Sequence, residues 1–142
     1  MTHKADLSFF DLKRPWSERK DLILAYYLKP YLWKLAKKNR PILLVDGFAG
    51  PGRFEDGSDG SPLIICKAAR SAKQEGLRVD VRVLCVEINP VLCARLRSHT
   101  SEFAGVAIEE AKFQDILPRI EVFARTGTVF LYLDPFTVTG LA

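Results

Sequence analysis

The stretch that decides the fold is Ile42-Leu43-Leu44-Val45-Asp46-Gly47-Phe48-Ala49-Gly50-Pro51-Gly52-Arg53-Phe54. A short apolar run ends at an acid, Asp46, and the turn that follows contains three glycines. This pattern is typical of the first strand and turn of an α/β fold, where bare backbone approaches an anionic or nucleoside ligand. We expect Asp46 to face the crevice at the carboxyl end of the strand, where a carboxylate accepts from amines or ribose hydroxyls.

The glycine spacing argues against two common nucleotide sites. A phosphate-binding Walker loop needs Gly-x-x-x-x-Gly-Lys-Ser/Thr, whereas Gly52 is followed by Arg53 and Phe54. A kinase or NTPase is therefore weakly supported. The nicotinamide pattern Gly-x-Gly-x-x-Gly is absent too, so a nicotinamide oxidoreductase fits the fold but not the spacing. A tight strand-to-helix turn without a ligand is the alternative interpretation of the loop.

Composition predicts one globular domain. The chain has 142 residues, of which 48% are hydrophobic and 27% charged, enough to build a core. No apolar run approaches the roughly 18 residues of a membrane span, and the N-terminus has no signal-peptide segment. We therefore expect a cytoplasmic protein without a membrane partner. The three cysteines lack Cys-x-x-Cys spacing and neither histidine lies near one, so no metal site is expected.

Positive charge is concentrated near the N-terminus. Residues 1–41 hold ten Lys or Arg against four acids, whereas the remaining residues are slightly acidic. Aromatic residues interleave with these cations, namely Tyr26, Tyr27, Tyr31 and Trp33. Basic residues with aromatics between them are compatible with nucleic-acid binding. The alternative is a solvated helix face with its aromatics turned inward.

An N-terminal helix is predicted in this basic segment. Apolar residues recur at helical spacing and should form one apolar face: Leu22, Ile23, Tyr26 and Tyr27, continued by Tyr31, Leu32 and Leu35. Pro30 should kink or restart the helix.

Predicted strands and helices alternate after residue 41. The strands are expected at residues 42–45, 79–86, 106–110 and 128–133, with helices between them. The second half of the second strand is continuously apolar, which indicates burial on both faces, as in a parallel sheet. The sequence therefore predicts an α/β fold, a three-layer αβα sandwich with about four parallel strands.

Acidic residues follow the second and third predicted strands. Glu87, beside Ile88, ends the second strand, and an acid at that place in a nucleotide-binding βαβ unit accepts both hydroxyls of a ribose. The alternative is that Glu87 caps the helix behind it. Asp115 follows the third strand and either accepts from an adenine amino group or serves as the N-cap of a helix beginning at Ile116.

The fourth predicted strand delivers Asp134, Pro135 and Phe136 to the same edge of the sheet. One reaction that this edge could support is the attack of an amine on a sulfonium methyl group. The amine then needs a hydrogen-bond acceptor that orients its lone pair. The Asp134 carboxylate and the Pro135 carbonyl supply acceptors, and the Phe136 ring supplies a wall for a base. These three residues are the predicted catalytic group.

Two motifs resemble those of S-adenosylmethionine-dependent methyltransferases. The run from Asp46 to Gly52 looks like motif I of the class I enzymes. Asp134-Pro135-Phe136 is similar to motif IV of amino-methyltransferases, although it lacks the second proline. Together with Trp16-Ser17, Lys20, Asp56-Gly57, Gly60-Ser61-Pro62-Leu63 and Glu87, they resemble the three-Cys-motif partner proteins over nearly the whole chain.

The resemblance implies a Rossmann-like class I methyltransferase domain over residues 41–142, incomplete at its C-terminus, after a basic helical extension over residues 1–40. It also implies S-adenosylmethionine as cofactor. The residues that it assigns to cofactor binding are Asp46, Gly47, Phe48, Ala49, Gly50, Gly52, Glu87, Ile88 and Asp115.

Two functions remain open at this point. The first is methyl transfer to an amine on nucleic acid or protein, with this chain as the cofactor-binding half of the enzyme. The second is a non-catalytic nucleoside-binding accessory protein that works with a neighbouring gene product. In both, the fourth strand is an apolar edge, which predicts self-association or a protein partner.

Overall fold

The computed structural model describes residues 15–135, in which helices and strands alternate. The elements are α1 (Pro15–Ala36), β1 (Ile42–Asp46), α2 (Ser61–Gln74), β2 (Val81–Glu87), α3 (Pro90–Thr100), β3 (Val106–Glu110), α4 (Phe113–Ala124) and β4 (Thr128–Tyr132). The strands form one parallel sheet in the order β3-β2-β1-β4. The predicted α/β fold with four parallel strands is confirmed.

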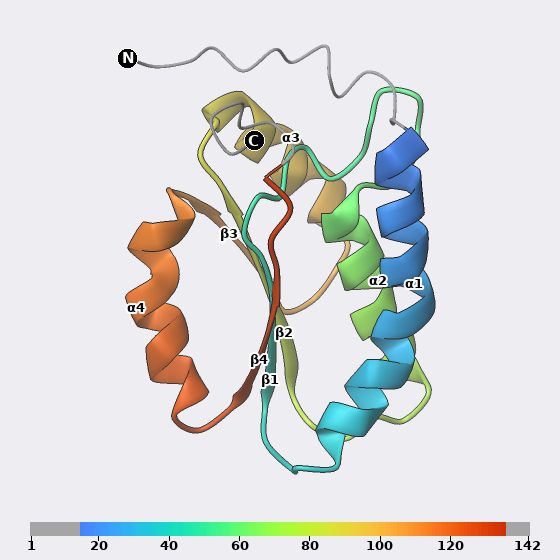
Figure 1. Cartoon of the computed structure of the whole chain (residues 1–142), viewed down its shortest axis with the longest axis vertical. Coiled ribbons are helices and arrows are strands. Elements are labelled where there is room, and N and C mark those ends of the chain that lie inside the picture. Colours follow the sequence, from blue (N-terminus) through green and yellow to red (C-terminus); the bar gives the residue numbers. More distant parts are fainter. Residues whose placement is uncertain (1–14, 136–142) are drawn as a thin grey trace.

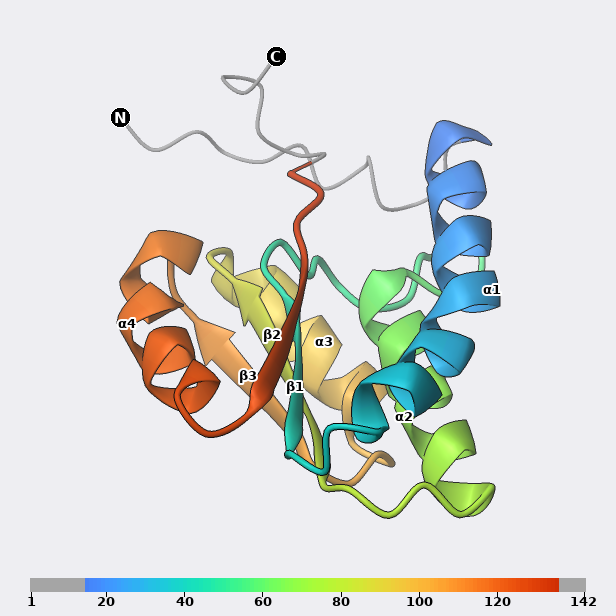
Figure 2. The same cartoon turned by 60° about the horizontal axis from the view of Figure 1, so that its bottom comes forward.

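The sheet lies between two helical layers, with α1, α2 and α3 on one face and α4 on the other (Figure 1, Figure 2). Successive residues of β1 point to opposite faces. Ile42 and Leu44 belong to the core under the first layer, and Leu43 and Val45 belong to the core under α4. Because both faces are covered, β1 is buried along its whole length, which explains its unbroken apolar sequence.

The strand order reverses beside β1. The chain places β2 and β3 on one side of β1 and β4 on the other. In open α/β sheets such a reversal creates a crevice outside the carboxyl ends of the strands, where ligands bind. Asp46 and Tyr132, the last residues of β1 and β4, are partners in the parallel ladder. The glycine turn begins at this point.

Helix α1 buries only part of the predicted apolar face. Its buried apolar residues are Leu24, Leu28, Leu32 and Leu35, which share one core with the sheet. Tyr26 and Tyr27 point to solvent with exposed fractions of 75% and 62%, and Leu22 and Ile23 are exposed as well. The predicted apolar face is therefore confirmed at Leu32 and Leu35 and wrong from Leu22 to Tyr27, and the interpretation in which the aromatics turn inward is wrong as well. Apolar residues follow helical spacing on two faces of α1, so spacing alone does not identify the one that packs.

The helix continues through Pro30, where the sequence predicts a kink or a restart. α1 continues through Pro30 to Ala36, and Figure 1 shows its axis changing direction in the C-terminal part. Pro30 is exposed, whereas Leu28 and Leu32 are buried on the opposite side. Packing of these leucines holds the helix together across a residue that has no N–H to donate to the Tyr26 carbonyl.

Strand β4 is the edge of the sheet, and no other strand of residues 15–135 pairs with its outer side. Most of its side chains are half-buried, and Leu131 is 43% exposed. The prediction of an apolar edge at the fourth strand is confirmed for this part of the chain.

Replacement of Pro30 by alanine should stabilise the fold. Pro30→Ala restores the missing N–H donor and relieves the clash with the preceding turn, so we expect the free energy of unfolding to rise by about 1 kcal/mol. Urea unfolding of both proteins measures the change, with Leu22→Ala as an exposed control on the same helix. A lower stability in Pro30→Ala would mean that the packing of α1 requires the proline.

Candidate functional site

Backbone hydrogen bonds tie the glycine turn to the strands on both sides of β1. The Gly47 N–H donates to the Tyr132 carbonyl over 3.0 Å, and the Ala49 N–H donates to the Val86 carbonyl over 3.0 Å. The turn therefore connects the ends of β4 and β2. Its backbone position is fixed at the reversal of the strand order.

The glycines of the turn are required for two different reasons. Gly50 and Gly52 have positive φ angles of 67° and 83°, which favour glycine. Gly47 instead needs space, because a Cβ there would lie 2.4 Å from Leu133 Cδ2 and 2.9 Å from the Phe113 ring. The space beside Gly47 is thus filled by side chains of this chain, whereas close approach of a ligand was the predicted reason for its lack of a side chain.

Asp46 is enclosed by the turn. Its side chain has no exposed surface and does not open to a crevice as predicted. Ser61 Oγ donates to Oδ2 over 2.5 Å, and the Phe48 N–H donates to Oδ1 over 3.4 Å. Burial raises the pKa of Asp46 to about 7; the hydrogen bonds oppose this rise, and the Asp21 and Asp134 carboxylates add to it. Asp46 therefore holds β1, the turn and the start of α2 together.

Glu87 joins the glycine turn to the next helix. Its Oε1 accepts from the Gly50 N–H over 2.9 Å, and its Oε2 accepts from the Asn89 N–H over 2.8 Å. Asn89 is itself the N-cap of α3, with its side chain accepting from Val91 and Leu92 N–H groups. Glu87 thus contacts the glycine turn as well as the residue that caps α3.

Contacts outside the predicted site also hold the turn. His99 Nδ1 of α3 lies 2.6 Å from the Pro51 carbonyl oxygen. The Phe48 ring lies beside that of Phe113 at the start of α4, with 6.2 Å between centroids. Sequence reasoning missed His99, because nothing near it in the chain indicates a partner 48 positions away.

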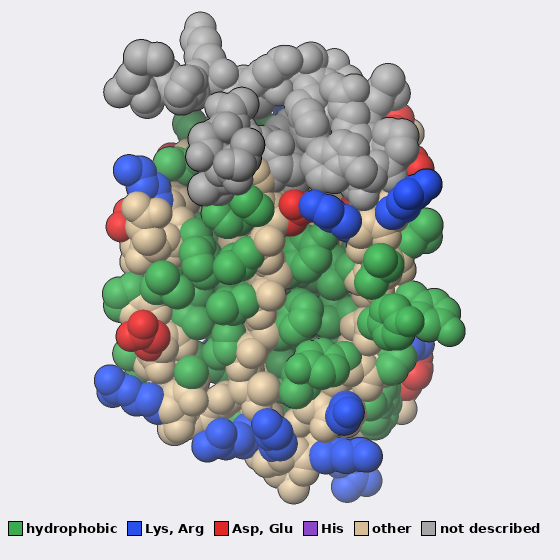
Figure 3. Space-filling model, in the orientation of Figure 1, with side chains coloured by type: hydrophobic (Ala, Val, Ile, Leu, Met, Phe, Trp, Pro, Cys, Tyr) green, Lys and Arg blue, Asp and Glu red, His purple; other side chains and the backbone are tan. Residues whose placement is uncertain are grey.

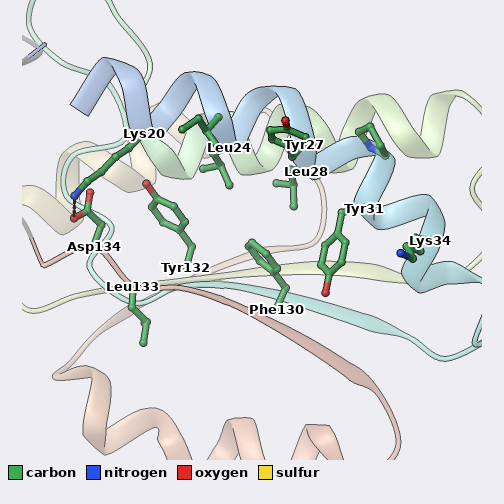
Figure 4. Close-up of a pocket in the computed structure, with 12 residues that line it drawn as sticks. Lys20, Leu24, Tyr27, Leu28, Tyr31, Lys34, Phe130, Tyr132, Leu133 and Asp134 are labelled. Atoms are coloured by element: carbon green, nitrogen blue, oxygen red, sulfur yellow. Dashed lines mark hydrogen bonds and ion pairs between the residues drawn. The ribbon is translucent and has the colours of Figure 1, made fainter. Parts of the chain in front are cut away.

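Asp134 lies two residues beyond β4 and turns toward α1 (Figure 4). Its Oδ1 accepts from Lys20 Nζ over 3.0 Å, and its side chain is 17% exposed. The Tyr132 hydroxyl nearby is shielded from solvent, and the Asp21 carboxylate lies close to it. Burial raises the pKa of Tyr132, and the carboxylates of Asp21 and Asp134 add to the rise. A group of acids therefore lies at the carboxyl ends of β1 and β4.

The remaining predicted residues lie around this edge. Ile88 is 58% exposed beside Glu87. Asp115 is exposed in the first turn of α4, whose N-cap is Lys112, so the interpretation of Asp115 as N-cap is wrong. Pro135 is half-buried, and Phe136 lies outside the described residues.

The described part of the chain offers few other kinds of site. Among residues 15–135, no group of His, Cys, Asp or Glu could hold a metal ion, and no helix is long and apolar enough to cross a membrane. All three cysteines are buried, and burial raises the pKa of each thiol, to about 12 for Cys66 and about 11 for Cys93. Nucleophilic thiolate chemistry is therefore disfavoured.

No protein-family model and no curated protein matches the sequence of this chain. The geometry of the sheet edge is therefore the basis for any functional assignment.

Asp46 should make the protein less stable as pH rises. Its pKa is about 7 when folded against an ordinary value of 3.8, so the folded protein binds more protons between these values. We expect Asp46 to lower the free energy of unfolding between pH 4 and 7, by up to about 1.4 kcal/mol per pH unit, with no further loss above pH 7.

Asp46→Asn isolates this effect because the amide retains an acceptor for Ser61 but does not ionise. Urea unfolding at pH 5 and pH 8 should show a smaller loss in the variant than in the unmodified protein. Asp80→Asn, at an exposed acid, is the control. Equal pH dependence in Asp46→Asn and the unmodified protein would contradict the assignment.

Proposed function

We propose that this chain is the cofactor-binding part of an S-adenosylmethionine-dependent methyltransferase that acts on an amine of nucleic acid or protein. The observation that carries the proposal is the Glu87 carboxylate, which ends β2 and is hydrogen-bonded to the Gly50 N–H of the turn. An acid at this place in an α/β sheet suits the hydroxyls of a ribose. The resemblance of the turn to methyltransferase motif I, and of the chain to three-Cys-motif partner proteins, supports the adenosyl ligand.

The residues around Glu87 fit an adenosyl group. Each carboxylate oxygen accepts one backbone hydrogen bond and has a second lone pair for a ribose hydroxyl. The exposed Ile88 offers an apolar contact for a flat purine, and Asp115 is the proposed acceptor for its amino group. When bound, S-adenosylmethionine supplies a sulfonium methyl carbon that is open to attack by an amine.

Asp134 is the proposed orienting group for the substrate. Its carboxylate would accept a hydrogen bond from the attacking amine and direct the nitrogen lone pair. The Lys20 ammonium donates to this carboxylate over 3.0 Å, and a substrate amine must displace it. The Pro135 carbonyl and the Phe136 ring keep their proposed roles as second acceptor and aromatic wall.

A non-catalytic accessory protein is the second candidate. The Lys20–Asp134 ion pair favours it, because the carboxylate proposed to orient the substrate already has a partner. In this case the chain binds the nucleoside ligand but transfers no methyl group, and it works with a neighbouring gene product.

Nucleic acid is one proposed partner, through the surface of α1. Four aromatic residues of α1 are exposed, namely Tyr26, Tyr27, Tyr31 and Trp33. Bases stack on exposed aromatics, and lysines contact the phosphates. Lys20 and Lys34 are separated by about 21 Å at 1.5 Å per helical residue. A single strand of several nucleotides is therefore long enough to reach from the basic end of α1 to Asp134.

Ligand binding tests the cofactor assignment. Calorimetric titration with S-adenosylmethionine, S-adenosylhomocysteine and NAD should show binding of the two adenosyl ligands and none of NAD. Glu87→Ala should weaken that binding at least tenfold, since loss of charge-assisted hydrogen bonds costs about 1.5 kcal/mol or more. Methyl transfer to nucleic-acid and protein acceptors then separates the enzyme from the accessory protein.

Glu110→Ala is a matched control for Glu87→Ala. Glu110 is the register partner of Glu87 on β3 and is exposed, so its loss should leave adenosyl affinity unchanged. Glu87→Gln keeps the size of the side chain and checks that weaker binding does not come from unfolding. Equal affinity in Glu87→Ala and the unmodified protein would refute the proposed site.

A further inference from the structure

The loops at the amino ends of the strands are rich in positive charge. Figure 1 shows the loops that follow α1, α2 and α4 at its lower end, where β1, β2 and β4 begin. Hydrogen bonds join these loops, from the Ile42 N–H to the Asp80 carbonyl and from the Thr128 N–H to the Pro41 carbonyl. Figure 3 shows Lys and Arg side chains gathered at the same end. The loops contribute five exposed cations, which we call the basic edge: Lys37, Lys38, Arg40, Arg78 and Arg125.

The basic edge has no carboxylate partner in the part of the chain that the structure describes. Among residues 15–135, none of its five cations forms an ion pair. The acids of the same loops pair with cations from other elements. Glu75 pairs with Lys29 of α1 over 2.5 Å, and Asp80 pairs with Arg82 of β2. The positive charge of the basic edge is therefore not compensated within residues 15–135.

Two arginines of the basic edge line one hollow. Arg40 precedes β1 and Arg78 precedes β2, and a hollow of about 370 Å³ lies between their loops. The guanidinium group of arginine is planar and presents several N–H donors in a geometry that matches the oxygens of a phosphate. Two such groups around one hollow can donate to the same phosphate.

The opposite edge of the sheet is acidic and does not attract phosphates. It carries Glu87, Asp115 and Asp134, close to the proposed positions of cofactor and substrate. The path along α1 from Lys20 to Lys37 is about 25 Å long at 1.5 Å per residue. This path exceeds the Debye length of about 8 Å at physiological ionic strength, so the acids do not cancel the attraction at the basic edge. A nucleic-acid strand whose amine reaches Asp134 therefore needs another surface for its phosphates.

Exposed aromatic side chains of α1 lie between the two edges. Trp33 precedes Lys37 by one helical turn, and Tyr26 precedes Trp33 by two turns, so the three residues share one face of the helix. Lys34, which lines the apolar groove between α1 and β4, adds a further cation along the helix (Figure 4). Bases of a single strand stack on such aromatics, whereas its phosphates contact the cations.

The composition of the loops favours nucleic acid over an anionic membrane as the partner. Proteins that lie on a membrane insert apolar side chains next to their cations. Of the exposed large apolar side chains within residues 15–135, none lies in the loops of the basic edge. The nearest one in sequence, Trp33, is on the helix face described above, where it is available for stacking.

We propose that the basic edge binds the phosphates of single-stranded nucleic acid, and that Arg40 and Arg78 hold the same phosphate. The strand then runs along α1, with bases stacked on Trp33 and Tyr26, toward Asp134. This inference rests on nucleic acid as the proposed partner and does not depend on the adenosyl ligand. It assigns strand binding and amine orientation to opposite ends of the sheet.

Fluorescence anisotropy with a labelled single-stranded oligonucleotide of mixed sequence tests the contact. Arg78→Gln should raise the dissociation constant about tenfold, because it removes charge-assisted hydrogen bonds to a phosphate. It should also reduce the slope of log affinity against log salt by about 0.7. Arg97→Gln, at an exposed arginine of α3, is the matched control. Equal affinities of the two variants, or no binding by the unmodified protein, would overturn the proposal.

A double substitution tests the shared phosphate. Arg40→Gln and Arg78→Gln together should weaken binding by less than the product of their single effects, because both act on one contact. Lys34→Gln combined with Arg78→Gln is the control, since Lys34 does not line the hollow, and here the single effects should multiply. Single effects that multiply for Arg40 and Arg78 as well would contradict a shared phosphate.

Two further measurements separate this inference from its alternatives. Vesicles that contain phosphatidylserine should bind the protein more weakly than the oligonucleotide does, and tighter vesicle binding that depends on Arg78 would overturn the proposal in favour of a membrane. The affinity for S-adenosylhomocysteine should be equal in Arg78→Gln and the unmodified protein. No adenosyl binding by the unmodified protein would refute the cofactor assignment alone, whereas oligonucleotide binding that is independent of Arg78 would refute the basic edge alone.

Discussion

The hydrogen bond from the Gly50 N–H to the Glu87 carboxylate is the interaction on which the candidate site depends. It joins a turn after β1 to the end of β2, 37 positions later in the chain, and it is buried. Charge-assisted hydrogen bonds of this kind are stronger than neutral ones. Because the second carboxylate oxygen binds the residue that caps α3, a single side chain sets the relative position of two strands, one turn and one helix.

The acids at the sheet edge differ in their surroundings and therefore in what they can do. Asp46 is enclosed and its pKa lies near neutrality, so its contribution is structural and depends on pH. Glu87 is buried and borders the exposed Ile88. Asp134 is partly open and holds an ammonium group. The three acids at this edge therefore have different roles. Asp46 supports the turn, Glu87 is the proposed ligand contact and Asp134 is the proposed substrate contact.

Local patterns predicted the strands and the glycine turn, because apolar runs bounded by turn residues report directly on strands. The features that could not be predicted depend on contacts between residues that are far apart in the sequence. The enclosure of Asp46 depends on Ser61, and the support of Pro51 depends on His99, neither of which is a neighbour in sequence. Leu24 and Leu28 on the buried face of α1 were missed because the packing of α1 against α2 and the sheet, and not helical spacing, selects the face.

The proposed function requires the turn after β1 and the Glu87 carboxylate to hold an adenosyl ligand. The most direct test is an amide ¹H–¹⁵N nuclear magnetic resonance titration of the whole chain with S-adenosylhomocysteine. We expect the largest shifts at Gly50, Gly52 and Ile88, which follow β1 and β2. Unchanged spectra at millimolar ligand, or shifts confined to the groove between α1 and β4, would contradict it.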